Sequence, residues 1–148
     1  MCGTRPADSA KVNQFDAVVT GKLSDKFSIG YNGTIFKIKS PALGRSLKDE
    51  TQDWWASAVY LNLDPVSTFG LTLRSEFFND QSQLAPTSFA TQGANIWANT
   101  LSANFKIHGL TIIPEIRMET ASKDVFYDKE SNPKGANTSL LVAAIYKF

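Results

Sequence analysis

Acidic and basic side chains alternate in two segments of the chain, a spacing that could bring them together on one wall. Arg74 and Glu76 are separated by one residue, and Glu115, Arg117 and Glu119 repeat the pattern. Paired carboxylates perform general acid–base chemistry when their environment pushes their pKa values apart. Here the intervening arginines hold the carboxylates ionised, so the pattern predicts a charged, water-facing wall and no enzyme.

The other residue types give no sign of a reaction centre. His108 is the single histidine and Cys2 the single cysteine, so neither a clustered metal site nor an internal disulfide is expected. No serine–histidine–aspartate arrangement, phosphate loop or nucleotide fingerprint is visible. With 15 basic and 14 acidic residues, the chain lacks the basic excess of a nucleic-acid binder. We expect no cofactor, no metal and no nucleic-acid partner.

The elements that position the charges are β-strands, because apolar and polar residues alternate with a period of two. This alternation recurs in seven segments, 14–23, 27–39, 54–63, 69–78, 96–107, 110–120 and 140–148. The third segment is apolar on both sides, and Asn62 suggests that its more apolar side holds Trp55, Val59, Leu61 and Leu63. Pro114 would interrupt a hydrogen-bonded ladder, so we expect it near the rim of the sheet or at a bulge.

The polar sides of these strands carry charges of both signs. They hold Asp16, Lys22, Arg74, Glu76, Lys106, Glu115, Arg117 and Glu119. Mixed charges of this kind line water-filled pores, and they also pair with one another and stiffen the wall. Four acids and four bases predict little net ion preference for this part of the wall.

Short and long connections alternate between the strands. The short ones are 24–26, 64–67 and 108–109, and the long ones are 40–53, 79–95 and 121–137. Outer-membrane barrels show this rhythm, with short periplasmic turns, long extracellular loops and an apolar side toward lipid. Aromatic residues near the strand ends would form two interfacial girdles: Phe15, Phe27, Trp54, Trp55, Phe69, Phe77, Phe78, Trp97, Tyr146 and Phe148.

The last segment, Leu140 to Phe148, has one wholly apolar side and ends on an aromatic ring. About nine to eleven residues are what a tilted strand needs to cross a bilayer core. The segment resembles the closing strand of Gram-negative outer-membrane barrels, whose terminal aromatic is read by the barrel-assembly machinery. That resemblance implies an assembly signal at Tyr146 and Phe148.

Several segments in order resemble the C-terminal part of the OmpL-like outer-membrane β-barrel porins of Bacteroidetes-type bacteria. They are Leu23–Asn32, Trp55–Leu61, Phe69–Asp80, Leu110–Arg117 and Ala144–Phe148. The resemblance covers residues 13–148 as the barrel portion and leaves 1–12 as a disordered segment or an extracellular-loop remnant. It implies a passive channel for small hydrophilic solutes in the bacterial outer membrane, with lipid and the assembly machinery as partners.

The expected fold is therefore all-β, an antiparallel up-and-down meander of about seven strands from the C-terminal portion of a transmembrane barrel. Barrels of this class normally have an even number of strands with both ends in the periplasm. We therefore expect an N-terminal barrel half to be missing and the sheet to be open. Two alternatives are a non-conducting structural or adhesive barrel in the outer membrane and a soluble lipocalin-like barrel that binds an apolar ligand.

Overall fold

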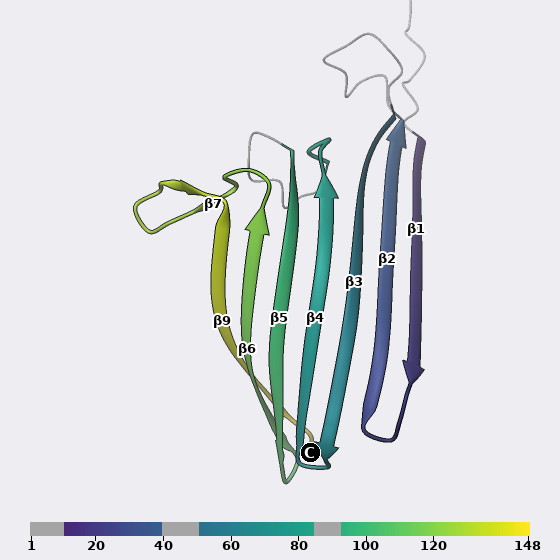
Figure 1. Cartoon of the computed structure of the whole chain (residues 1–148), viewed down its shortest axis with the longest axis vertical. Coiled ribbons are helices and arrows are strands. Elements are labelled where there is room, and N and C mark those ends of the chain that lie inside the picture. Colours follow the sequence, from purple (N-terminus) through teal and green to yellow (C-terminus); the bar gives the residue numbers. More distant parts are fainter. Residues whose placement is uncertain (1–10, 40–50, 85–92) are drawn as a thin grey trace, which may run out of the picture.

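A single antiparallel sheet dominates the computed structural model, which describes residues 11–39, 51–84 and 93–148. Seven strands follow one another across the sheet in chain order (Figure 1). They are β1 (Lys11–Lys22), β2 (Phe27–Lys39), β3 (Thr51–Val66), β4 (Phe69–Asp80), β5 (Ala94–Ile107), β6 (Leu110–Ala121) and β9 (Ala136–Tyr146). The predicted all-β meander of seven strands is confirmed. The described part of the chain has no helix long and apolar enough to cross a membrane.

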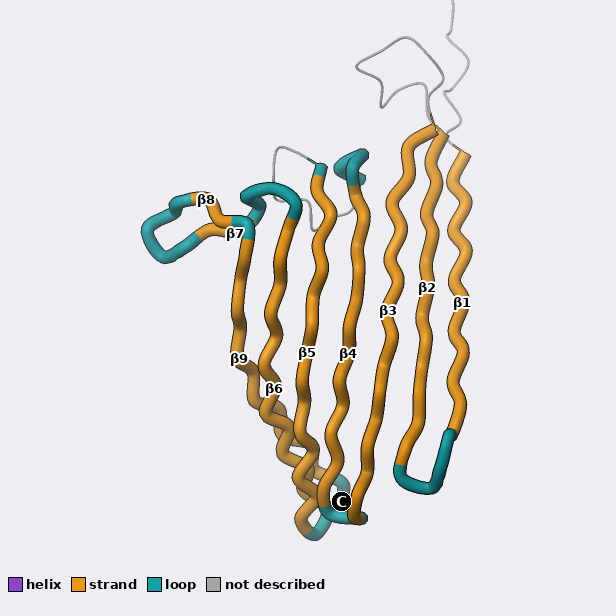
Figure 2. The backbone as a smooth tube through the Cα atoms, in the orientation of Figure 1, coloured by secondary structure: helices purple, strands orange, loops and turns teal. Residues whose placement is uncertain are grey.

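The sheet is open, as predicted. Its strand order begins with β1 and ends with β9, and these two strands are not paired with each other. Figure 2 shows the strands side by side, with the backbone curving most strongly where β6 and β9 approach the short-turn end. The backbone groups on the outer edges of β1 and β9 therefore lack a strand partner within the described sheet.

Short connections join the strands at one end of the sheet. His108 and Gly109 both have positive φ, 44° and 87°, which is the geometry of the two-residue turns that match the twist of a hairpin. In the β1–β2 turn, the Ser24 hydroxyl accepts hydrogen bonds from the backbone N–H of Lys26 and Phe27. The connection between β3 and β4 is shorter than the predicted segment 64–67, because β3 continues through Val66 with a register shift after Leu63.

The opposite end carries the longer connections, and one of them contains a strand pair that alternation did not reveal. Between β6 and β9, β7 (Phe126–Tyr127) pairs with β8 (Pro133–Lys134). The strands are too short to show a period of two, which is why the sequence predicted a plain loop. Asp128 tightens the connection by accepting hydrogen bonds from the backbone N–H of Glu130 and Asn132. The bond from Asn132 is the main cause that lowers the pKa of the Asp128 carboxyl below its usual value.

Other strand bounds also differ from the expected ones. β1 begins at Lys11, before the predicted boundary at residue 13, and β9 spans 136–146 where 140–148 was expected. Lys147 still donates its backbone N–H to the Gly109 carbonyl at 2.9 Å, but the strand ends at Tyr146. The expectations for Cys2, for residues 1–10 and for the loop segments 40–50 and 85–92 lie outside the described residues.

Pro114 lies in the first half of β6, opposite Val142 of β9, and its register is undisturbed. On the other side, the β5–β6 pairing is interrupted between Ser102–Glu115 and Phe105–Ile112 and resumes in the same register. Of the two predicted placements, the bulge is therefore wrong, and Pro114 lies in the half of β6 that is nearer the short β5–β6 turn. A proline lacks the N–H that the ladder needs, so it removes one local pairing without inserting an extra residue.

A single sheet has no second layer to cover it, and large apolar side chains remain exposed. Among the described residues, the buried apolar side chains are those of Ala58, Ala94 and Ala98. Val19, Leu101 and Val142 are all exposed. The sheet is held by its backbone ladder and by contacts between side chains of neighbouring strands.

The charged face as candidate functional site

Cross-strand pairing places the predicted charged residues on one face of the sheet. Directly opposed residues of an antiparallel pair point to the same side, and the pairing runs from Arg74 through Thr100 to Arg117. Following the register across the seven strands gives one face, called the charged face below, that holds Asp16, Lys22, Arg74, Glu76, Lys106, Glu115, Arg117 and Glu119.

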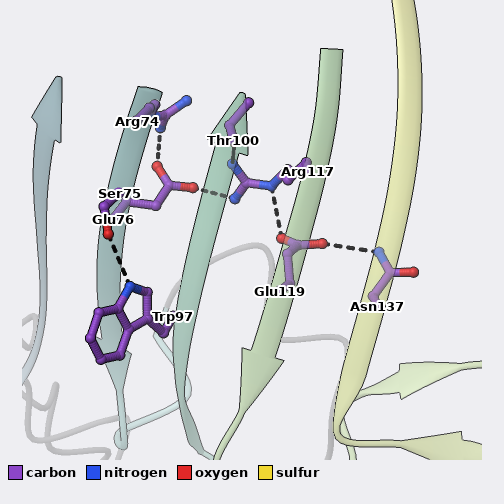
Figure 3. Close-up of polar contacts among 8 residues, drawn as sticks. All are labelled: Arg74, Ser75, Glu76, Trp97, Thr100, Arg117, Glu119 and Asn137. Atoms are coloured by element: carbon purple, nitrogen blue, oxygen red, sulfur yellow. Dashed lines mark hydrogen bonds and ion pairs between the residues drawn. The ribbon is translucent and has the colours of Figure 1, made fainter. Parts of the chain in front are cut away.

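Four of these residues form a connected group, the ionic cluster of Arg74, Glu76, Arg117 and Glu119. The Glu76 carboxylate pairs with the guanidinium groups of both Arg74 and Arg117. Arg117 Nε donates to Glu119 Oε1 at 3.0 Å. Figure 3 shows how these bonds extend from β4 across β5 to β6 and then to Asn137 of β9, whose Nδ2 donates to Glu119 Oε2 at 3.0 Å.

The cluster can form because the strand between its members carries small side chains. Ala98 of β5 is 1 % exposed and Thr100 is 4 % exposed, beneath the long side chains that reach over them. Arg117 also donates from Nη1 to the Thr100 hydroxyl at 3.2 Å, which fixes it above β5. Two guanidinium groups and two carboxylates meet there, so the cluster has no net charge. Its ion pairs brace three strands laterally.

The other predicted charges lie apart from the cluster. Lys106 Nζ pairs with Asp64 Oδ1 at 3.4 Å near the short turns. Glu115 accepts a hydrogen bond from the Ser102 hydroxyl at 2.7 Å. Asp16, on β1, accepts from Gln14 and from the Thr34 hydroxyl. These residues share a face with the cluster but form local pairs along the wall.

Sequence reasoning missed several polar residues of this face, among them Asn137, Asp64 and Tyr60. Asp64 falls in a segment predicted to be a turn, and the register shift in β3 brings it to Lys106. Tyr60 lies beside the Arg74 guanidinium, whose carbon is 5.6 Å from the ring centroid. The spacing of two from Asn62 could have identified Tyr60, because Asn62 already marked the polar side of the third strand.

The structure corrects part of the aromatic-girdle prediction. Trp54 is paired with Phe36, and Phe78 lies opposite Ala56, so these rings stand on the charged face. Phe36 and Trp54 stack with centroids 5.6 Å apart, and Trp54 contacts Phe78 at 5.8 Å. The sequence placed Trp54 and Phe78 in a girdle only because they are near strand ends. Side chains alternate between the two faces along a strand, and the positions of Trp54 and Phe78 in that alternation place them on the charged face.

The remaining face is mostly apolar and exposed, and near the long-loop end it also carries Lys37 opposite Asp53. Two aromatic pairs lie on it. The ring centroids of Trp55 and Phe77 are 5.3 Å apart, and those of Phe69 and Phe105 are 5.2 Å apart. Trp97 satisfies its indole N–H by donating to the Ser75 hydroxyl at 3.0 Å (Figure 3). The third strand shows the predicted facing, with the more apolar side formed by Trp55, Val59, Leu61 and Leu63.

The two residues predicted as an assembly signal lie at the end of the chain. Tyr146 is the last residue of β9 and pairs with Leu110, which places its ring on the apolar face. Phe148 lies beyond the strand with a fully exposed side chain. The two rings are stacked with their centroids 6.5 Å apart.

Comparison with known proteins agrees with this architecture. A family model described as "Putative beta-barrel porin-2, OmpL-like" matches residues 3–148. No curated protein and no solved structure matched the chain. The match spans nearly the whole chain, and the open antiparallel sheet with one charged and one apolar face is the arrangement that a barrel wall requires. The chain therefore belongs to the OmpL-like β-barrel porin family.

Proposed function

We propose that the chain is part of an outer-membrane channel for the passive diffusion of small hydrophilic solutes. The observation that carries this proposal is the separation of side chains by face. All the predicted charged residues share one side of a continuous sheet, and exposed apolar side chains cover the other. In a membrane, such a sheet turns its apolar side to lipid and lines a water-filled lumen with its charges.

Side chains on the charged face are less exposed than those on the apolar face, and this difference supports a lumen on the charged side. On β5, Ala98 and Thr100 of the charged face are 1 % and 4 % exposed, whereas Trp97 and Leu101 of the apolar face are 57 % and 46 % exposed. Side chains converge on the concave side of a curved sheet and spread apart on its convex side. These exposures support the proposal that the charged face is the inner wall, with the eight charged side chains directed toward the pore.

The lengths of the strands and the state of the edges agree with a membrane setting. The seven strands have 11 to 16 residues, and about nine to eleven suffice to cross a bilayer core. In lipid, every backbone donor and acceptor must be paired, so β1 and β9 require further strands. We propose that an N-terminal barrel half supplies them and that the assembly machinery inserts the completed barrel into the bacterial outer membrane.

Single-channel recording in planar lipid bilayers tests the proposal. The protein, purified with any strands encoded upstream in its gene, should give stepwise conductance in KCl. The channel should show little preference between K⁺ and Cl⁻. A folded, membrane-inserted protein without conductance steps would favour the non-conducting structural or adhesive barrel. A protein that stays soluble and monomeric without detergent would favour the lipocalin-like alternative.

A further inference from the structure

Two hollows adjoin each other in the middle of the charged face. The first, of about 490 Å³, lies over Gly30 between β1, β2 and β3. The second, of about 420 Å³, lies over Ala58 and Ala98 between β2 and β6. Asn32 and Tyr60 line both hollows, so the two hollows adjoin at these residues, and we call them together the central groove. Each part has the size of a small-molecule site.

Small residues form the floor of the central groove, and Tyr60 stands at its centre. A Cβ atom built on Gly30 would lie 3.5 Å from Tyr60 Cβ and 3.7 Å from Tyr60 Cδ2, so the glycine leaves the space beside the tyrosine open. On the other side of Tyr60, the Arg74 guanidinium lies 5.6 Å from the ring centroid. The aromatic ring is therefore held between an open hollow and the ionic cluster.

The first hollow offers hydroxyl and amide groups, together with one amine. Its polar side chains are those of Thr20, Lys22, Ser28, Asn32, Tyr60 and Asn62. Asn62 is oriented by two contacts, because its Oδ1 accepts from the Thr72 hydroxyl at 2.9 Å and its Nδ2 donates to Ser28 Oγ at 3.4 Å. Amides and hydroxyls both donate and accept hydrogen bonds, and so do the hydroxyls of a sugar.

The second hollow offers charges that are already paired. Glu76 is held by two arginines, and Arg117 is held by two carboxylates, so the ionic cluster is neutral as a whole. An ion of either sign would meet both like and opposite charges there, so the cluster gives it little net attraction, and the remaining charge of the groove is the Lys22 amine of the first hollow. A neutral ligand gains hydrogen bonds to the outer edges of the clustered groups without needing a free counter-charge.

We propose that the central groove binds a neutral polyhydroxylated solute, a saccharide, as it passes through the lumen. Tyr60 packs against the apolar C–H face of a sugar ring, while the amides of Asn32 and Asn62 and the rim of the ionic cluster bind its hydroxyls. The low floor at Gly30 and Ala58 gives the ring room to lie flat. This inference rests on the proposed channel and names its solute class.

The test compares two tyrosines on opposite faces of the sheet. Tyr60→Leu removes the ring from the central groove. Tyr31 also borders the first hollow, but its position opposite Val59 and the hydrogen bond that its hydroxyl accepts from Ser57 place its ring on the apolar face, so Tyr31→Leu removes a ring outside the groove. Maltotriose is added to the KCl bath of a single channel, and the concentration that halves the current is measured. We expect Tyr60→Leu to raise this concentration roughly two- to tenfold, the effect of one aromatic contact, and Tyr31→Leu to leave it unchanged.

A second pair of variants keeps the test informative if Tyr60→Leu folds poorly. Tyr60→Phe retains the ring and should keep most of the block, whereas Gly30→Val fills the first hollow and should weaken the block. Saturation-transfer NMR of maltotriose with the protein in detergent micelles provides a readout that needs no conductance.

The outcomes for the saccharide site and for the channel are separable. KCl conductance without maltotriose block, and without saturation transfer, would overturn the saccharide site while the channel proposal stands. Equal block of the Tyr60 and Tyr31 variants would also overturn it, as would stronger block by glutamate than by maltotriose. Absence of conductance would overturn the channel, and the NMR signal would still decide whether the groove binds sugar.

Discussion

At the scale of single residues, Glu76 is the centre of the charged face. Its carboxylate joins Arg74 on its own strand to Arg117 two strands away, and its side chain is 16 % exposed. Loss of this carboxylate would leave two guanidinium groups close together over a crowded floor. The balance of charge in the lumen and the lateral bracing of β4, β5 and β6 therefore depend on the same group.

Glu76→Gln should lower the free energy of unfolding by about 1–3 kcal/mol, because hydrogen bonds to charged groups are worth about that much when one partner is removed. The measurement is urea unfolding of the protein folded in detergent micelles, followed by tryptophan fluorescence. The same variant should shift the reversal potential in a KCl gradient toward anions, because the wall loses one negative charge.

Glu115→Gln is the matched control, since it makes the same change of charge. Glu115 has a hydrogen bond from the neutral Ser102 and no ion pair among the described salt bridges. It should shift the reversal potential in the same direction with a smaller loss of stability. Equal destabilisation by the two variants would show that the ionic cluster does not brace the strands.

Phe148 lies outside β9 and is fully exposed, so its side chain adds little to the folded sheet. We expect Phe148→Lys to leave folding into detergent micelles unchanged and to reduce the amount of heat-modifiable protein in the outer membrane of cells. Phe148→Tyr, which keeps an aromatic end, should assemble normally. If Phe148→Lys reached the outer membrane at the level of the unaltered protein, the assembly-signal proposal would fail.

At the scale of elements, the β5–β6 hairpin requires an unusual backbone conformation in its turn. Gly109 has a φ of 87°, a conformation that residues with a side chain rarely adopt. A Cβ atom there would lie 2.9 Å from the Lys147 carbonyl oxygen. The same turn also receives the end of the chain, through the bond from Lys147 N–H to the Gly109 carbonyl. The β5–β6 turn and the last residues are thus joined at one point.

Gly109→Ala should therefore destabilise the β5–β6 hairpin, by on the order of 1–3 kcal/mol for a strained backbone position. Gly21→Ala is the control, because a Cβ atom there would come no closer than 3.9 Å to Ile29 Cγ2. Thermal unfolding in micelles, with hydrogen exchange of β6 and β9, would detect the difference. Equal effects of the two alanines would rule out turn strain as the cause.

At the scale of the whole molecule, the direction of the strands restricts how the sheet can close. Each strand is antiparallel to its neighbour, so β1 and β9, the first and last of seven, run in the same direction. Direct pairing of β1 with β9 would be parallel, unlike every other pair in the sheet. An entirely antiparallel barrel needs an odd number of additional strands between them.

Cysteine cross-linking would test this restriction. In a Cys2→Ser background, cysteines at Phe15 or Val19 of β1 are combined with cysteines at Leu140 or Val142 of β9, positions that are all exposed and on the apolar face. A disulfide needs Cα atoms within about 7 Å, so no intramolecular bond should form under mild oxidation if other strands separate the edges. Efficient cross-linking within one chain in the membrane would show that the barrel closes without them.

The sequence alone determined the seven strands of the main sheet, their order and their facing. Alternation with a period of two depends only on the identity of neighbouring residues, so it located each of the seven strands and assigned all eight charged residues to their polar sides. The family resemblance followed from the same segments, and the family match agrees with it. The two-residue turn at His108 and Gly109 was also visible, because its residue types are those that positive φ favours.

Only the tertiary structure decided which of these residues meet. The ionic cluster joins residues 41 positions apart in the chain, and it exists because the intervening strand offers Ala98 and Thr100 as a low floor. The contact of Asp64 with Lys106 and the pairing of β7 with β8 both depend on how neighbouring strands are aligned. Register is set by many weak pairings at once, and no single segment of sequence contains it.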